Sequence, residues 1–333
     1  MIVRFGYVAM STVVQNASPS KTMTYKTFSN LTDREAAIRR LEAIATENLH
    51  NTLRLLRHNA ASDIKVYRFS SKLIPLATHG ELADWNPFEA LQEPFAEIGS
   101  FVRKQGMRVS FHPDHFTVFS TPRPEVLQSS IRDLGYHISM LEAMGLDGRA
   151  KNNIHVGGAY GDKPSAAERF KQNISALPES YRTRLTLEND DKTFNAQETL
   201  DICEALGLPM VLDIHHQWVN NEGELPDELW PRILKTWSSP LAQADSPVED
   251  PLPPKIHASS PKSVSDPRGH ADHVIVAPLL GFLRNIASKT DRVDVMLEAK
   301  LKDGALYALM EDLARYQGDG VRILDEATVE ILA

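Results

Sequence analysis

Arg184-Leu185-Thr186-Leu187-Glu188-Asn189-Asp190-Asp191 decides how the fold is read, because a short apolar run there ends on a carboxylate and enters an acidic turn. We expect a strand over 184–188. A glutamate at the end of a buried strand is costly unless a cation meets it. The pattern recurs along the chain as a short apolar run, then a His, Asp or Glu, then a loop. The polar ends of these runs therefore need a common partner.

Apolar runs of this kind alternate with helical patterns. The strands are expected over 2–8, 66–71, 108–112, 153–158, 184–188, 209–216, 255–259 and 293–300. The helices are expected over 32–58, 86–106, 124–144, 165–177, 196–206, 227–238, 272–288 and 304–316. Alternation predicts a parallel sheet, and eight units predict closure into a barrel. We therefore expect an α/β fold, a single TIM (β/α)8 barrel domain over 1–333, with 318–333 as an extra helix or strand packed outside it. A doubly wound open sheet is less favoured, because no Gly-rich phosphate turn follows the first strand.

The amino-acid composition limits which classes of function are expected for this chain. The chain has 333 residues, of which 42% are hydrophobic and 24% charged, as in ordinary soluble proteins. No stretch approaches the length of apolar chain that a membrane span needs, so we expect no membrane partner. The single cysteine, Cys203, lies in a helical pattern, which predicts no disulfides and a cytoplasmic protein. A net charge of −8 argues against a nucleic-acid binder unless the acids hold metal ions.

The expected strand ends carry candidate metal ligands. These are His112, His155, Glu188, Asp213, His216, His257 and Glu298, with His79 and His270 in the following loops. The carboxyl ends of barrel strands face one crater, where imidazoles and carboxylates bind Zn²⁺ or Mn²⁺. A lone strand-end histidine is more often a hydrogen-bonded core residue, so the argument depends on how many gather at one end. With Glu188 bridging, the set suits two or three ions, which hold the attacking and leaving oxygens of a phosphodiester.

Lys255 shares a strand face with His257, because the two residues are two positions apart. An ammonium group beside a cluster of dications is strongly unfavourable. The lysine is therefore neutral, points past the cluster to a phosphate, or carries a carboxylate by modification. The remaining interpretation is that the Lys255 ammonium group is a solvated charge at the rim of the crater.

Several short motifs, taken in order, resemble one known family. They are Gly6-Tyr7-Val8-Ala9-Met10, Asn16-Ala17-Ser18-Pro19-Ser20-Lys21-Thr22, Arg68-Phe69-Ser70-Ser71, Phe111-His112-Pro113, His155-Val156-Gly157-Gly158, Leu187-Glu188-Asn189-Asp190, Asp213-Ile214-His215-His216, Lys255-Ile256-His257 and Glu298-Ala299-Lys300. Together they resemble the UV damage endonuclease family, relatives of endonuclease IV. The likeness covers nearly the whole expected barrel.

The resemblance implies a metal-dependent repair endonuclease acting on double-stranded DNA that contains UV lesions. Such an enzyme cuts immediately 5′ to cyclobutane pyrimidine dimers, 6-4 photoproducts and abasic sites, and leaves a 3′-hydroxyl and a 5′-phosphate. It implies two or three Mn²⁺ ions, with Zn²⁺ or Co²⁺ as the other choices. The ligands carried over by motif are His112, His155, Glu188, Asp213, His216, His257, His270 and Glu298. Glu188, Lys255 and His79 are expected in catalysis, and Lys255 falls on the lysine that can be carboxylated in this family.

The probing loop departs from the family pattern. Where the family often has a glutamine and an aromatic residue after His-Pro-Gly, this chain has His115 and Phe116 after Asp114. Phe116 can still wedge between bases. Tyr7 is expected either to stack on an extruded base or to be a core tyrosine. For phosphate contacts we expect the basic residues Lys21, Arg68 and Arg268.

Two other functions compete with the nuclease. A divalent-metal sugar isomerase or epimerase uses the same barrel and ligand types, but normally needs fewer ligands. A non-catalytic DNA-damage binding module is less favoured, because binding alone does not need a hydrolytic metal set. Since a nuclease crater needs no partner subunit, a monomer is expected.

Overall fold

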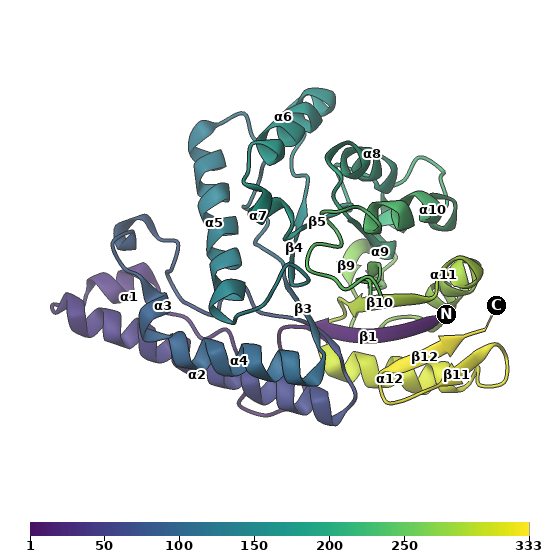
Figure 1. Cartoon of the computed structure of the whole chain (residues 1–333), viewed down its shortest axis with the longest axis horizontal. Helices are drawn as coiled ribbons and strands as arrows, with labels where there is room; N and C mark the ends of the chain where they lie inside the picture. The colour runs from purple at the N-terminus through teal and green to yellow at the C-terminus, as the bar shows by residue number, and fades with distance from the viewer. Residues whose placement is uncertain (333) are drawn as a thin grey trace.

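The computed structural model describes residues 1–332 and consists of a closed parallel barrel. Figure 1 shows the helices arranged around the strands. The barrel strands are β1 (Ile2–Val8), β2 (Val66–Arg68), β3 (Arg108–Phe111), β4 (Lys151–His155), β5 (Leu185–Glu188), β6 (Met210–Asp213), β7 (Lys255–Ala258) and β10 (Arg292–Leu297). Each pairs in parallel with the next, and β10 pairs with β1 to close the ring. The predicted TIM barrel is thus confirmed, and the open sheet is excluded.

Helices follow the strands and cover the outside of the barrel. They are α1 (Tyr25–Ser29), α2 (Arg34–Ala61), α3 (Pro87–Ala90), α4 (Gln92–Gln105), α5 (Pro124–Ala143), α6 (Lys163–Ser175), α7 (Glu179–Arg182), α8 (Ala196–Leu206), α9 (Ile214–Val219), α10 (Pro226–Trp237), α11 (Val276–Ile286) and α12 (Lys302–Ala314), with 3-10 turns η1 (Gly80–Leu82) and η2 (Ala287–Lys289). None of the helices described is long and apolar enough to cross a membrane.

Local capping explains where several elements begin. Asp33 accepts hydrogen bonds from the amides of Glu35 and Ala36 and starts α2. Asn195 and Glu198 form a reciprocal capping box at α8, and Gly207 ends that helix in a left-handed conformation. These caps lie within a residue or two of the predicted helix boundaries.

The sixth strand is shorter than predicted. We expected a strand over 209–216, but β6 ends at Asp213 and α9 begins at Ile214. The cause is the Asp213 side chain, which accepts a hydrogen bond from the His216 amide and so caps a helix directly at the strand end. His215 and His216 therefore lie on a helical turn.

Two hairpins add to the barrel. A short antiparallel pair, β8 (Pro261–Ser263) and β9 (Asp266–His270), follows β7 where no strand was predicted. The C-terminal segment forms β11 (Val321–Ile323) and β12 (Thr328–Ile331), and β12 pairs antiparallel with the first half of β1. That edge is free because β2 pairs only with Gly6–Val8. The tail is therefore part of the sheet, and it lies beside the N-terminus in Figure 1.

Candidate metal centre

Glu188 lies buried at the C-terminal end of β5, surrounded by imidazoles from neighbouring elements. Its Oε2 atom is 3.2 Å from His112 Nε2 and 4.0 Å from His155 Nε2. Its Oε1 atom is 3.0 Å from His257 Nδ1 and 3.7 Å from His216 Nδ1. One buried carboxylate thus faces four imidazoles, and both of its oxygens are engaged.

Ligand atoms around Glu188 fall into three groups, each within 4.8 Å: His112–His155–Glu188, Glu188–Asp213–His216 and Glu188–His257–Glu298. Every group contains Glu188 and at least one imidazole. Imidazole and carboxylate donors at this spacing fit Zn²⁺ or Mn²⁺. The structure therefore brings together the candidate ligands except His79 and His270, in an arrangement that could hold two or three ions sharing one carboxylate.

His270 lies at the edge of this cluster. Its Nδ1 atom is 2.8 Å from the backbone carbonyl of Glu298, and its ring centroid is 6.1 Å from that of His216. It belongs to none of the three groups, although β9 carries it to the same end of the barrel.

The pKa values of the clustered side chains suit a site in which bound protons are replaced by metal ions. Burial opposes ionisation of Glu188, but His257 and His155 outweigh it and hold its pKa well below the usual range. Burial likewise opposes charge on His216 and His257, but the facing carboxylates, Glu188 among them, raise the pKa of each to about 9. A cation entering the centre would displace protons from these two rings, because metal binds only the neutral imidazole.

Hydrogen bonds from polar neighbours fix the ligands in place. Asn189 bridges two strands: its side chain donates to the Asp213 carbonyl and accepts from the Asp213 amide, each at 2.9 Å. Asn153 donates to Glu188 Oε2 and accepts from the Thr186 hydroxyl. Asn153 was not predicted, although the alternation of strand side chains places it on the same face as His155.

His215 was also missed as a functional residue. Its Nδ1 atom is 2.6 Å from Ser259 Oγ, and its Nε2 atom is 2.7 Å from the Pro267 carbonyl. It therefore joins α9 to the β8–β9 hairpin that carries His270. Its position next to His216 in the motif was the available signal.

Lys255 is buried beneath the centre and donates to Ser110 Oγ at 3.0 Å. Burial, with repulsion from Arg108, lowers the pKa of Lys255 well below its usual value. The reading of Lys255 as a solvated rim charge is therefore wrong, and a neutral amine beside the cluster fits the structure.

Three predicted site residues are engaged elsewhere. The Tyr7 ring is buried in the core, and its hydroxyl donates to Asn59 at 2.6 Å, so it cannot stack on a base in this conformation. His79 stacks on Tyr25 at 4.1 Å and belongs to no ligand group. Arg68 pairs with Glu298 inside the crater, so it holds a ligand in place and is not free on the rim.

The other predicted DNA contacts lie at the surface. The side chain of Phe116 is among the most exposed of the large apolar side chains at 75%, and its ring is 4.0 Å from that of His115 in the loop after β3. Lys21 pairs with Glu47 at 2.7 Å, and Arg268 on β9 is 3.9 Å from Asp191. Phe116 thus presents an exposed aromatic ring, whereas the two cations are exposed but each lies beside a carboxylate.

A family model, two relatives and a solved structure indicate the same family for this chain. The family model for UV-endonuclease UvdE matches residues 3–330. A UV DNA damage endonuclease of Bacillus pumilus is 44% identical over 95% of each chain, and that of Bacillus velezensis is 42% identical over 96% of each. The crystal structure of SacUVDE superposes with a TM-score of 0.79 at 29% identity, covering 95% of this chain and 99% of that one. The chain that carries this cluster of histidines and carboxylates belongs to the UV-endonuclease UvdE family.

Proposed function

We propose that this UV-endonuclease family member is a metal-dependent DNA repair enzyme that hydrolyses the phosphodiester immediately 5′ to a UV lesion. The observation that carries the proposal is the set of three ligand groups sharing Glu188 at the open end of the barrel. The products would be a 3′-hydroxyl and a 5′-phosphate. The substrates would be double-stranded DNA with cyclobutane dimers, 6-4 photoproducts or abasic sites.

The protein's side chains would have distinct roles in this reaction. The three groups around Glu188 would hold two or three divalent ions, Mn²⁺ first, with Zn²⁺ or Co²⁺ as alternatives. Such ions supply activation of water and stabilisation of the charge that develops on the phosphate. Arg68 would keep Glu298 ionised and in place, because it pairs with that carboxylate. Lys255, buried and with a lowered pKa, would act as a neutral base or a modified ligand.

Lesion recognition would fall to the exposed loop after β3. Phe116 presents an apolar ring to solvent, with His115 packed against it. An apolar wedge unstacks a base step at a cost of a few kcal/mol, and a damaged step that is already distorted costs less. Lys21 and Arg268 would contact backbone phosphates. We further expect a monomer working in the cytoplasm, where the lone buried Cys203 stays reduced.

The deciding experiment is a nicking assay on supercoiled plasmid, irradiated or not, with Mn²⁺, Zn²⁺, Co²⁺ or EDTA. We expect irradiation-dependent nicks in Mn²⁺ that EDTA abolishes. A duplex with one defined dimer would map the cut, and ligation would report the end groups. Equal nicking of both plasmids, or none in any metal, would refute the proposal. Turnover of a free sugar would instead support the sugar isomerase or epimerase.

A further inference from the structure

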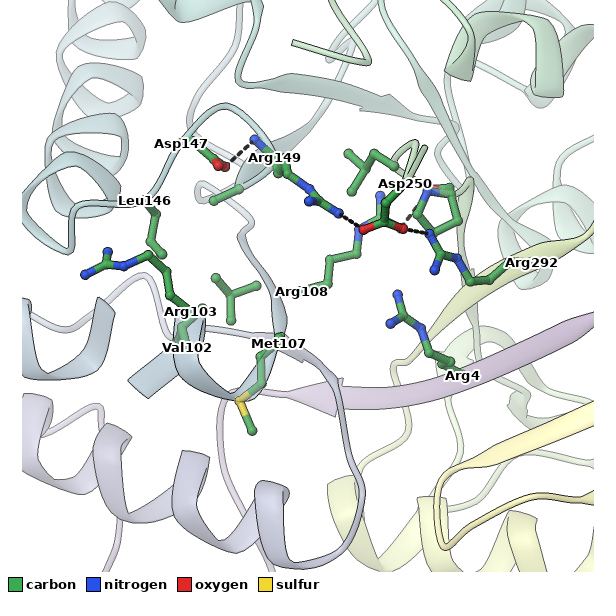
Figure 2. A pocket seen from close by; sticks show the side chains of 15 residues that line it. Arg4, Val102, Arg103, Met107, Arg108, Leu146, Asp147, Arg149, Asp250 and Arg292 are labelled. Carbon is green, nitrogen blue, oxygen red and sulfur yellow. Dashed lines mark hydrogen bonds and ion pairs between the residues drawn. The ribbon is translucent and has the colours of Figure 1, made fainter. Parts of the chain in front are cut away.

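A cavity of about 290 Å³ lies at the N-terminal ends of the barrel strands (Figure 2). Arg4, Arg108 and Arg292 line it from the first residues of β1, β3 and β10, and Arg149 lines it from the loop before β4. Parallel strands all enter a barrel at one end, so this cavity is on the opposite side from Glu188. Its volume lies at the small end of the range for ligand sites.

Two carboxylates partly neutralise these arginines. Asp250 accepts from Arg149 Nη2 at 3.0 Å and from Arg292 Nη2 at 2.8 Å, and Figure 2 shows these side chains converging on it. Hydrogen bonds from the same two arginines lower the pKa of Asp250, so it is ionised at neutral pH.

Behind them, buried Asp294 accepts from Arg4 Nε at 2.7 Å and from Arg108 Nη1 at 2.8 Å. Its pKa is also lowered: burial opposes this, but Arg4 and Arg108 outweigh it. Arg103 and Asp147 also line the cavity, so five guanidinium groups lie beside three carboxylates, those of Asp147, Asp250 and the buried Asp294. The wall of the cavity carries an excess of positive charge in a chain whose net charge is −8.

One buried donor of these arginines has no hydrogen-bond partner among the residues described. Arg108 is only 7% exposed, and its Nη2 atom has no hydrogen-bond partner among the residues described. Burial and repulsion from Arg4 and Arg292 lower the pKa of Arg108 to about 10. The Arg108 guanidinium lies over the Trp237 ring, 5.1 Å from its centroid, and its buried charge is costly. An anion bound in the cavity would lower that cost through the electrostatic attraction between the two charges.

The apolar part of the lining, which we call the apolar wall, comprises Val102, Met107, Val109, Leu146 and Leu252, and Arg103 and Asp147 also line the cavity. Figure 2 shows Val102, Met107 and Leu146 on the side away from Asp250. A ligand with one charged end and one apolar or flat end would satisfy both walls.

We propose that this cavity binds a small phosphomonoester, with its phosphate on the arginine wall and its body on the apolar wall. Guanidinium groups match phosphate oxygens because they donate in pairs from a rigid plane. A purely structural role explains Arg4 and Arg108, which enclose Asp294. It does not explain Arg149 and Arg292, whose side chains are 32% and 33% exposed and pair with a half-exposed Asp250. Exposed pairs of this kind contribute little to stability.

The test is calorimetric titration of the metal-loaded protein with inorganic phosphate, thymidine 5′-monophosphate and thymidine. Phosphate also binds divalent ions, so Glu188→Gln serves to remove the metal centre. The cavity variant is Arg149→Gln/Arg292→Gln, with Arg149→Gln alone as the milder form. The matched control is Arg232→Gln, because Arg232 also forms an exposed pair, with Asp201 and Glu204, away from the cavity.

We expect thymidine 5′-monophosphate to bind wild type, Glu188→Gln and Arg232→Gln alike, more tightly than inorganic phosphate, and thymidine not to bind. The double variant should lose at least about tenfold in affinity, and the single variant less. Binding that disappears in Glu188→Gln would overturn the proposal, and so would equal binding to the arginine variants. Inorganic phosphate binding as tightly as the nucleotide would overturn the part assigned to the apolar wall. If the double variant fails to unfold as one cooperative transition, the single variant decides.

Discussion

Glu188 and Asp294 are both buried carboxylates inside the barrel, one at each end, and the protein accommodates them in opposite ways. Asp294 is enclosed by Arg4 and Arg108 at 2.7 and 2.8 Å. Glu188 is enclosed by four imidazoles within 4.0 Å. Both guanidinium groups are charged at neutral pH, even with the pKa of Arg108 lowered to about 10, so Asp294 needs no further cation there. Imidazoles are neutral near neutral pH unless held protonated, so Glu188 has neighbours that can exchange protons for metal.

The difference teaches which buried charges stabilise the fold and which are available for chemistry. An arginine-enclosed carboxylate is a permanent ion pair, and its removal leaves a buried cation uncompensated. The negative charge of a carboxylate enclosed by histidines is balanced by protons or metal ions taken up from solution. The two ends should therefore respond differently to the same substitution, to acid and to chelators.

The largest contrast is expected in activity. Glu188→Gln removes the ligand common to all three groups, and we expect nicking of irradiated plasmid to fall more than about 1000-fold, while binding to irradiated duplex stays near wild type. Single-turnover nicking and a gel-shift measurement would show both. Retained cleavage would mean that Glu188 is not a shared ligand. Bound metal, counted by elemental analysis, should fall in the same variant.

At the other end, Asp294→Asn should act on stability. The change leaves the buried Arg108 guanidinium without its carboxylate, and we expect a loss of about 3–5 kcal/mol in the free energy of unfolding. Urea denaturation in EDTA measures it without a contribution from metal. The matched control is Asp250→Asn, whose carboxylate is half exposed and should cost less than about 1 kcal/mol. Equal losses in the two variants would remove the distinction between buried and exposed pairs.

The stability contributed by the two ends of the barrel should depend on pH in opposite directions. The pKa of Asp294 is held below its unfolded value, so its stabilising contribution is present above about pH 4 and is lost as the pH falls through its folded pKa. In metal-free protein the pKa values of His216 and His257 are raised to about 9. Their contribution is present below about pH 6.5 and is lost as the pH rises through about 9.

Urea denaturation of EDTA-treated protein across pH 3–10 would test both signs. Glu188→Gln should remove much of the alkaline loss, because the carboxylate that raises both histidine pKa values is gone. Asp294→Asn should remove part of the acid loss. An alkaline loss that is unchanged in Glu188→Gln would show that other groups cause it.

Local patterns in the sequence were sufficient to predict the barrel and most of the ligand set, because short apolar runs that alternate with helical patterns, and His, Asp and Glu residues at their ends, are visible without coordinates. His112, His155 and Glu188 came together as expected. What could not be predicted depends on side-chain partners distant in sequence. The Asp213 side chain caps α9, and β6 is shorter for that reason. The Arg68–Glu298 ion pair joins residues that are 230 positions apart in the sequence. The Tyr7 hydroxyl donates a hydrogen bond to Asn59 across the core, and no local sequence pattern predicts this contact.

The smallest expected effect concerns His79, and it tests whether contact with the Glu188 cluster is what distinguishes the functional histidines. His79 follows β2 as a catalytic residue would, but it stacks on Tyr25 and its Nδ1 atom accepts from the Glu81 amide at 3.3 Å. A general acid or base contributes about 100- to 10,000-fold, so His79→Ala should lower nicking by that amount if the histidine takes part in proton transfer. If packing on Tyr25 is its role, the change should be within about threefold, as for a surface substitution worth about 0.5 kcal/mol. We expect the smaller value, with His112→Ala as the matched variant that touches Glu188 directly. Large losses in both would extend the functional centre past the shared carboxylate to the loop after β2, because a histidine outside every ligand group would then have to move toward the crater during the reaction.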